Sequence, residues 1–277
     1  MDKPLYRVLL GLPSGDSFHW ERNALAVQYA AAIRSTEAEA QPFRITMRLV
    51  RGSISLLPLN FNHLWCCAKN YGRWEDGVEA PADFFAMLHA DVSAEFGWLR
   101  KLIAICLEKD ADAVSAICAI KSEHGLTSCG IDPFGPMLPH KRMTMAELAN
   151  MPETWCAADI GHPNIPTLIN TGCWVWDLRR PLAQQFTGFH FFDEVRKHIN
   201  AKGQEEWRAH NEPEDWRFSQ WAFEHGGRLY NTRAVRTEHF GPRIHSNDPA
   251  DWYGAKGAWQ RDEAFEDQIV RETPAAA

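Results

Sequence analysis

The chain has 277 residues, of which 45% are hydrophobic and 23% charged, and its formal net charge is −7. These values are typical of a globular protein with one large or two small domains, and they exclude a chain whose whole surface attracts nucleic acid or anionic membrane. The seven cysteines include no C-x-x-C pair, which argues against a zinc ribbon or a disulfide scaffold and favours reduced thiols in a cytoplasmic protein.

Segments with strand and helix patterns alternate over residues 5–120. Strands are predicted at 6–12, 43–50, 84–88 and 113–120, and helices at 21–33, 60–69 and 95–109. The apolar run in the first strand is too short for a membrane span or a signal peptide, so we expect no membrane association. The alternation predicts βαβ units: an α/β protein with a mostly parallel central sheet flanked by helices.

The second half of the chain is less regular. Residues 121–166 contain six prolines and four glycines, and only 144–151, which open with a Thr144-x-x-Glu147 capping box, have a helical pattern. Strand character returns at 167–178, a helix is predicted at 213–225, and short strands at 228–231 and 234–237. We therefore expect one domain over 1–241, with an irregular insertion at 121–166 and a polar C-terminal extension at 242–277.

His89 and Asp91 directly follow the apolar run Phe84–Leu88. Side chains two apart on an extended segment point the same way, and open α/β sheets bind ligands at the carboxyl ends of their strands. An imidazole and a carboxylate facing one point are suited to a divalent cation. The structural alternative is that Asp91 caps the next helix and His89 is an ordinary polar residue at the end of a strand.

Glu214 and Asp215 follow Pro213 at the start of a predicted helix. Acidic residues in a first turn complement the helix dipole and need no function. In the functional interpretation, one of the two carboxylates is a general base for an attacking hydroxyl. His239, after a short strand, is a candidate third metal ligand, and His245 is its weaker rival.

The order of these segments resembles that of GT-A fold glycosyltransferases, particularly the family 2-like enzymes. Met87-Leu-His-Ala-Asp91 stands in the place of the family's Asp-x-Asp motif, with Asp91 matching its last Asp and His89 replacing its first. Glu214-Asp215-Trp216 is similar to the family's Glu-Asp-Trp segment, and Thr237-Glu-His239-Phe-Gly is similar to the segment whose His completes the metal site. The resemblance implies metal ligands at Asp91, His239 and His89, with Asp215 as the catalytic base and Glu214 beside it.

The same resemblance implies binding residues for both substrates. The donor-binding residues are Pro13, Ser14, Asp16, Asn62, His89, Ala90, Asp91 and Gly172, and the acceptor-binding residues are Asn170 and Trp216. The implied reaction moves a sugar from a nucleotide sugar (a UDP-sugar above all) to a hydroxyl group. One base and one metal imply inversion, and retention, which needs another arrangement, stays open. The implied cofactor is Mn²⁺ or Mg²⁺, which neutralises the leaving diphosphate.

Three alternatives stay open at this point. Compact chains with this strand also resemble glycosyltransferase-like proteins of phages, some of which glycosylate hydroxymethylated bases of their own DNA. The local excess of Lys and Arg over residues 228–261 fits such an acceptor, in a host cytoplasm. A module that binds nucleotide sugars without catalysis is the second alternative. A sugar nucleotidyltransferase is the third, disfavoured because residues 12–20 contain no Lys or Arg.

Overall fold

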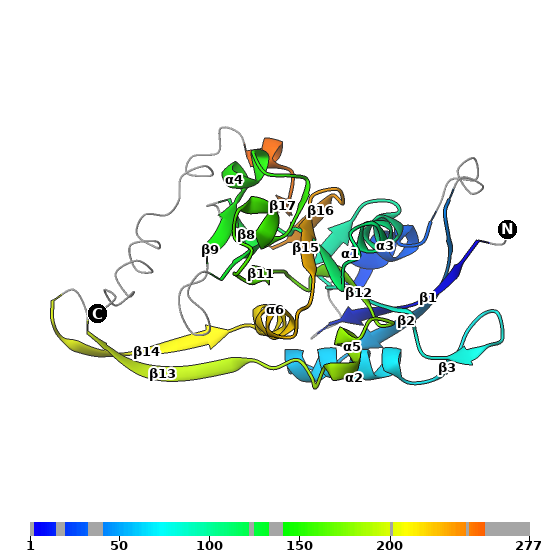
Figure 1. Cartoon of the computed structure of the whole chain (residues 1–277), viewed down its shortest axis with the longest axis horizontal. Coiled ribbons are helices and arrows are strands. Elements are labelled where there is room, and N and C mark those ends of the chain that lie inside the picture. Colours follow the sequence, from blue (N-terminus) through cyan, green and yellow to red (C-terminus); the bar gives the residue numbers. More distant parts are fainter. Residues whose placement is uncertain are drawn as a thin grey trace.

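The computed structural model describes residues 3–14, 20–32, 41–121, 125–132, 141–199, 202–241 and 244–252. A seven-stranded sheet, ordered β10-β15-β7-β12-β5-β1-β2, lies at its centre, with helices on both faces (Figure 1). Its strands are β1 (Leu5–Pro13), β2 (Arg44–Gly52), β5 (Phe84–Leu88), β7 (Ala113–Ala116), β10 (Thr154–Trp155), β12 (Cys173–Asp177) and β15 (Leu229–Thr232). The protein is therefore an α/β protein, as predicted.

The direction of the strands corrects one prediction. β1 pairs in parallel with β2 and β5, and β15 pairs in parallel with β7. However, β12 runs antiparallel to both β5 and β7, and β10 runs antiparallel to β15. The sheet is mixed, so the prediction of a mostly parallel sheet is wrong. All five residues of β12 are buried, so its apolar run looks like that of a parallel strand whichever way it runs.

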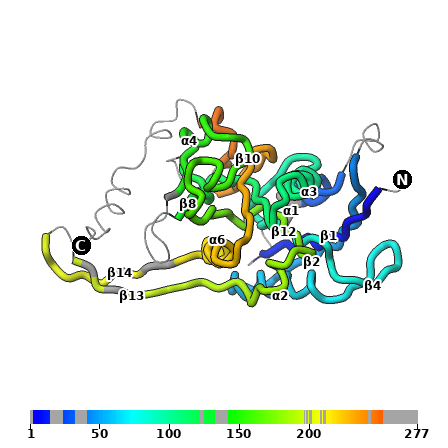
Figure 2. The backbone as a smooth tube through the Cα atoms, viewed as in Figure 1, coloured from blue at the N-terminus to red at the C-terminus, as the bar shows by residue number. Residues whose placement is uncertain are grey.

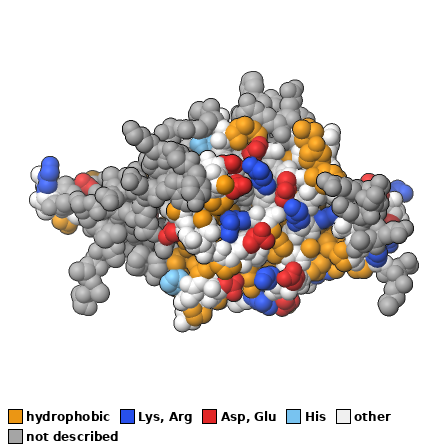
Figure 3. Space-filling model, turned by 90° about the horizontal axis from the view of Figure 1, so that it is seen from above, with side chains coloured by type: hydrophobic (Ala, Val, Ile, Leu, Met, Phe, Trp, Pro, Cys, Tyr) orange, Lys and Arg blue, Asp and Glu red, His pale blue; other side chains and the backbone are white. Residues whose placement is uncertain are grey.

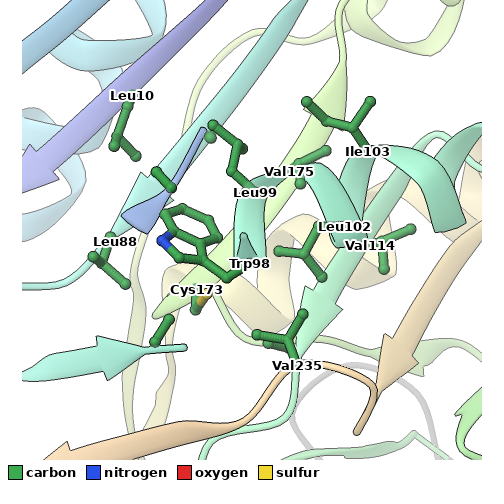
Figure 4. Packing of buried hydrophobic residues seen from close by; sticks show 14 of the residues in the cluster. Leu10, Leu88, Trp98, Leu99, Leu102, Ile103, Val114, Cys173, Val175 and Val235 are labelled. Atoms are coloured by element: carbon green, nitrogen blue, oxygen red, sulfur yellow. The ribbon is translucent and has the colours of Figure 1, made fainter. Parts of the chain in front are cut away.

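Helices cover the two faces because successive strand residues point to opposite sides. Phe84, Ala86 and Leu88 join the core cluster that contains Trp98, whereas Phe85 and Met87 join the cluster on the other face. One face carries α1 (Trp20–Tyr29) and α3 (Trp98–Glu108), and the other carries α2 (Leu57–Lys69), α5 (Leu182–Gln185) and α6 (Glu214–Glu224). Trp98 lies among the aliphatic side chains of the first cluster (Figure 4), and its indole Nε1 donates to the Ala26 carbonyl at 2.8 Å.

Helix α3 begins three residues later than predicted. Val92–Ala94 form strand β6, which pairs with β16 (Thr237–Phe240), and β16 pairs in turn with β17 (Ile244–Ser246). Gly97 has φ 74°, a left-handed conformation that favours glycine and separates β6 from the helix. Phe96, within the helix predicted at 95–109, precedes α3 and is 40% exposed. The pairing of β6 with β16 is what brings β16 against Asp91.

Residues 125–132 and 141–166 are ordered into small elements, which corrects the predicted irregular insertion. They comprise β8 (Leu126–Ile131), β9 (Lys141–Thr144), α4 (Met145–Ala149), β10 and η2 (Ala157–Ile160). β8 pairs with β9 and with β11 (Thr167–Leu168), and a separate hydrophobic cluster fills this part. The capping box is confirmed, since Thr144 Oγ1 accepts from the Glu147 N–H at 3.1 Å. Trp252, in η3 (Pro249–Trp252), also joins that cluster.

Two hairpins complete the described structure. β3 (Gly72–Arg73) and β4 (Glu79–Ala80) form the shorter one, and β13 (Phe192–Ile199) and β14 (Glu205–Glu212) form a long ribbon. The ribbon extends away from the central sheet, beside α6 (Figures 1 and 2). Trp207 on this ribbon is 68% exposed, and the sequence analysis predicted no strands here. In the described part of the chain, no helix has the length and hydropathy needed to cross a membrane.

Candidate functional site

Several segments meet at the carboxyl edge of the central sheet. β5 ends at Leu88, and because β12 is antiparallel to it, β12 begins at this same edge, with Cys173 opposite Leu88. The segment just before β12 therefore lies beside the turn that follows β5. Both are at the end of the sheet where open α/β proteins bind their ligands.

Asn170 joins three strand ends at this edge. Its side-chain Nδ2 donates to the Ala116 carbonyl and its Oδ1 accepts from the Gly172 N–H, both at 2.9 Å. The Ser115 hydroxyl donates to the Asn170 carbonyl at 2.7 Å, and the His89 N–H donates to the Gly172 carbonyl at 2.8 Å. Asn170 is 3% exposed. The residue predicted to contact the acceptor thus has both amide atoms bonded to main chain, which makes it a support for the site.

Asp91 and His239 are brought into contact although 148 residues separate them. The Phe240 N–H donates to the Asp91 carbonyl at 2.7 Å, and β16 places His239 opposite Val92. His239 Nε2 then lies 3.3 Å from Asp91 Oδ2. Its Nδ1 lies 2.7 Å from the Ala119 carbonyl, which only accepts, so Nδ1 carries the proton and Nε2 faces Asp91. This arrangement, with the distal nitrogen directed at a ligand position, is common among metal-binding histidines.

Lys121 is the third member of this cluster. Its ammonium group donates to the same Asp91 oxygen, Oδ2, that faces His239. Burial alone would raise the pKa of Asp91, but the neighbouring His239 ring and the Lys121 ammonium group outweigh it and hold that pKa well below its usual range. Asp91 is therefore a carboxylate at every physiological pH. We call Asp91, His239 and Lys121 the Asp91 cluster.

His89 lies next to this cluster but points elsewhere. Its ring packs against Phe61, with 5.3 Å between ring centroids, and its Nε2 is 3.5 Å from Thr171 Oγ1. Burial lowers the pKa of His89 to about 4, against the opposing charge of Asp91, so the imidazole is neutral. In the described part of the chain, no three His, Cys, Asp or Glu side chains are grouped as metal ligands.

Two of the predicted ligands nevertheless fit a divalent cation. Adjacent ligands of a cation bound at about 2.1 Å are roughly 3 Å apart, and the 3.3 Å between His239 Nε2 and Asp91 Oδ2 is close to that span. Mg²⁺ is commonly held by one or two protein carboxylates together with substrate phosphates and water. A site with two protein donors is therefore consistent with a cation that enters with a phosphorylated ligand.

The acidic start of α6 is joined to this edge through the segment that carries Asn170. The Ser219 hydroxyl donates to the Asp215 carbonyl at 2.7 Å and accepts from the Ile169 N–H at 3.1 Å. Glu214 is 4% exposed, and Asp215 is half-buried. Burial raises the pKa of both carboxyls. The charge of Asp215 raises that of Glu214 further, whereas the Arg142 guanidinium opposes the shift of Asp215.

No protein-family model matches this sequence. A search of curated proteins finds no relative either. The function must therefore be argued from the geometry of the site.

The remaining predicted residues lie in defined places. Ser14 follows Pro13 at the end of β1, where its N–H donates to the Gly52 carbonyl at 2.9 Å. Asn62, on α2, is bonded through both amide atoms to the main chain of Phe189, at 2.6 and 2.9 Å. Ala90 lies within the turn that joins β5 to β6. Asp16 lies outside the described residues.

Trp216 and Arg142 form a stacked pair beside Asp215. The guanidinium carbon lies 4.2 Å from the Trp216 ring centroid, and the indole Nε1 donates to the Ser128 carbonyl at 3.1 Å. Trp216 is largely buried. The ring predicted to contact an acceptor is thus covered by Arg142, and its indole holds β8 against α6.

The predicted basic segment is largely neutralised where the structure describes it. Arg228 is paired with Asp110 at 2.7 Å and Arg236 with Asp251 at 3.1 Å. Trp252, an aromatic residue within this segment, is buried, and its indole donates to the Ser246 carbonyl. In Figure 3, positive and negative side chains are interspersed on the described part of the visible face. These observations do not favour a nucleic-acid surface on the described part of this segment.

Lys121 is the residue that the sequence analysis missed. It follows the fourth predicted strand, as Asp91 follows the third, and parallel strands end at the same edge of a sheet. A basic residue after one strand and an acidic residue after another were the available signal. This pattern does not predict which of the charged residues at strand ends form an ion pair.

Proposed function

We propose that this protein is a metal-dependent glycosyltransferase, which moves a sugar from a nucleotide-sugar donor to a hydroxyl acceptor with inversion. The observation that carries the proposal is the meeting of Asp91 and His239 at the carboxyl edge of the sheet, connected through Ser219 and Ile169 to the acidic start of α6. A cation ligand pair at this edge, and a carboxylate with a raised pKa joined to it through the segment that carries Asn170, suit displacement of a diphosphate by a hydroxyl.

Asp91 and His239 would hold the cation. When bound, a divalent cation supplies Lewis-acid neutralisation of the charge on the departing diphosphate. The hydrogen bond from His239 Nδ1 to the Ala119 carbonyl fixes the ring so that Nε2 faces the ligand position. Asn170 Oδ1 accepts from the Gly172 N–H, and the Gly172 carbonyl accepts from the His89 N–H. These hydrogen bonds restrain the turn that carries Asp91.

Asp215 is the proposed general base. A base is most effective when its pKa lies near the working pH, and burial raises the pKa of Asp215 toward neutrality. Glu214 stays protonated to higher pH than an exposed glutamate, because burial and the charge of Asp215 both raise its pKa. The proton of the acceptor hydroxyl would go to Asp215. The oxygen would attack the anomeric carbon as the bond from that carbon to the diphosphate oxygen breaks, which releases the nucleoside diphosphate.

The first experiment is a thermal-shift panel of UDP-, GDP-, TDP- and CMP-sugars, with and without Mn²⁺. A ligand at 100 times its Kd stabilises the native state by about 2.7 kcal/mol. We expect one donor to raise the melting temperature only when Mn²⁺ is present, and Asp91→Asn to abolish that shift. Asp76→Asn, on the turn between β3 and β4, is the matched control and should leave the shift unchanged.

A second measurement separates an enzyme from a binding module. Release of nucleoside diphosphate from the stabilising donor, with water or a panel of hydroxyl acceptors, should occur in the wild type. Asp215→Asn should keep the thermal shift and lose the release. The wild-type rate should fall as pH drops through the raised pKa of Asp215, at higher pH than for an exposed aspartate. A panel without any shift would overturn the proposal, and a shift without release would favour the non-catalytic module.

A further inference from the structure

The Asp91 cluster contains a positive charge at the position where a cation would bind. Lys121 Nζ and His239 Nε2 both approach Asp91 Oδ2, so a divalent cation bound by Asp91 and His239 would use an oxygen that Lys121 already occupies. Two positive charges on one carboxylate oxygen repel each other. The ammonium group and the cation therefore compete for Asp91.

Lys121 is held in this place by the backbone on both sides. It lies two residues after Ala119, whose carbonyl accepts from His239 Nδ1. Its aliphatic chain packs against Gly241, where an added Cβ would lie 3.1 Å from Lys121 Cδ. The segments 119–121 and 239–241 thus lie side by side, and a glycine at 241 leaves room for the lysine stem. The arrangement of the strands therefore determines where Lys121 lies.

The charges of the cluster suggest what releases Lys121. The Lys121 ammonium group and the Asp91 carboxylate cancel each other's charge. A divalent cation arriving alone would leave a net positive charge in a partly buried place, which is unfavourable. The diphosphate of a nucleotide sugar carries two negative charges, so cation and diphosphate together restore neutrality. The lysine side chain is about one-third exposed and has a flexible stem, and lysine is a common phosphate-binding residue.

We propose that Lys121 is a diphosphate-binding residue that also excludes the cation from the ligand-free protein. It occupies Asp91 until the donor arrives, and then transfers its ion pair to the diphosphate while the cation takes its place on Asp91. Cation and diphosphate consequently bind together, each raising the affinity for the other. This inference rests on the proposed function, because it names how the same site selects its ligands.

The test is a Mn²⁺ titration followed by electron paramagnetic resonance, with the full chain and without any nucleotide. The wild type should bind Mn²⁺ weakly, and Lys121→Met should bind it at least about tenfold more tightly, since the competing charge is gone. Lys121→Arg retains the charge and should resemble the wild type. Lys101→Met is the matched control, because Lys101 forms a comparable surface pair with Glu95 at 2.5 Å, and it should leave Mn²⁺ binding unchanged.

The titration is repeated with UDP or GDP present. In the wild type, the nucleotide should raise the apparent Mn²⁺ affinity beyond what the Mn²⁺–nucleotide complex in solution explains. Lys121→Met should lose most of this coupling and bind the nucleotide roughly tenfold more weakly. Circular dichroism and melting temperature establish that each variant is folded.

The outcomes separate this inference from the proposed function. If the wild type binds Mn²⁺ and a nucleotide together but Lys121→Met behaves like Lys101→Met, the role of Lys121 is refuted and the proposed function stands. If neither the wild type nor any variant binds Mn²⁺ or a nucleotide, both are refuted. A gain in Mn²⁺ affinity in Lys121→Met, with a loss of coupling, supports the inference.

Discussion

Replacing Asn170 by alanine tests whether this residue supports the site or contacts a substrate. The substitution leaves the buried Gly172 N–H without its hydrogen-bond partner. It also removes one donor from the Ala116 carbonyl, which still accepts from the Ser115 hydroxyl at 3.1 Å. A buried group left unsatisfied costs about 1–3 kcal/mol and the loss of one hydrogen bond about 0.5–1.5 kcal/mol, so the free energy of unfolding should fall by roughly 1.5–4.5 kcal/mol. A contact made only with a substrate would leave the stability of the ligand-free protein unchanged.

Urea unfolding of the ligand-free protein measures this loss. With an m-value of about 3 kcal/mol/M, the midpoint should drop by roughly 0.5–1.5 M. Asn150→Ala is the matched control: its side chain is exposed and makes one hydrogen bond, to the Ala146 carbonyl at 3.2 Å. Its effect should stay within about 0.5 kcal/mol. Equal midpoints for the two variants would refute the supporting role and favour a direct contact with a ligand.

Three further predictions concern other parts of the molecule. Because burial and Asp215 raise the pKa of Glu214, the folded state retains this proton to higher pH than the unfolded chain, and stability falls as pH rises between the two pKa values. The melting temperature of Glu214→Gln minus that of the wild type should therefore increase from about pH 5 to about pH 9. A difference that stays the same at every pH would contradict this prediction. Trp98→Ala should cost about 3–5 kcal/mol in urea unfolding, because the ring is fully buried, whereas Trp207→Ala, on the exposed ribbon, should cost less than about 1 kcal/mol. Asp112→Ala should lower the free energy of unfolding by about 2–4 kcal/mol, since this buried carboxylate accepts from Arg180 Nε and the Arg228 N–H. Because Asp112 lies at the opposite edge of the sheet, the substitution should leave ligand binding unchanged. Loss of the donor-induced thermal shift in this variant would contradict that prediction.

Much of the fold could be predicted from local patterns. Five consecutive apolar residues at Phe84–Leu88 predicted a strand buried on both faces, and all five are buried. Pro213 before two acidic residues, and Gly226 after the last turn, predicted the bounds of α6 closely. These features were predictable because propensity, capping and hydrophobic periodicity depend on neighbours in the chain.

The ribbon β13–β14 and the strands β8 and β9 were missed for one physical reason. Short strands with polar faces lack a clear alternation of apolar and polar residues. The exposed side chain of Trp207 gives no core periodicity, and prolines in residues 121–166 suggested irregular structure. Pairing partners, rather than local preference, determine such strands.

In the candidate site too, local patterns predicted some features and only the structure shows the others. Asp91, His239, Glu214 and Asp215 were chosen from their places at the ends of predicted elements, and contacts between the elements bring the first two together. Asn170 was predicted to touch a substrate, but its amide is bonded to the backbone. A sequence shows that a polar residue lies at a strand end; only the neighbouring strand shows whether its hydrogen bonds are already made.

The sequence by itself determined which segments are buried, where the main helices lie and which acidic and imidazole groups stand at strand ends, because burial follows from the transfer free energy of each side chain and its local period. The tertiary structure alone decided that β12 runs antiparallel to β5. It also decided that His239 and Lys121, which lie 148 and 30 residues from Asp91 in the sequence, both approach Asp91 Oδ2. Strand order and direction decide these contacts. An ion pair needs its two groups within about 4 Å, and that proximity is a property of the assembled sheet, not of either segment.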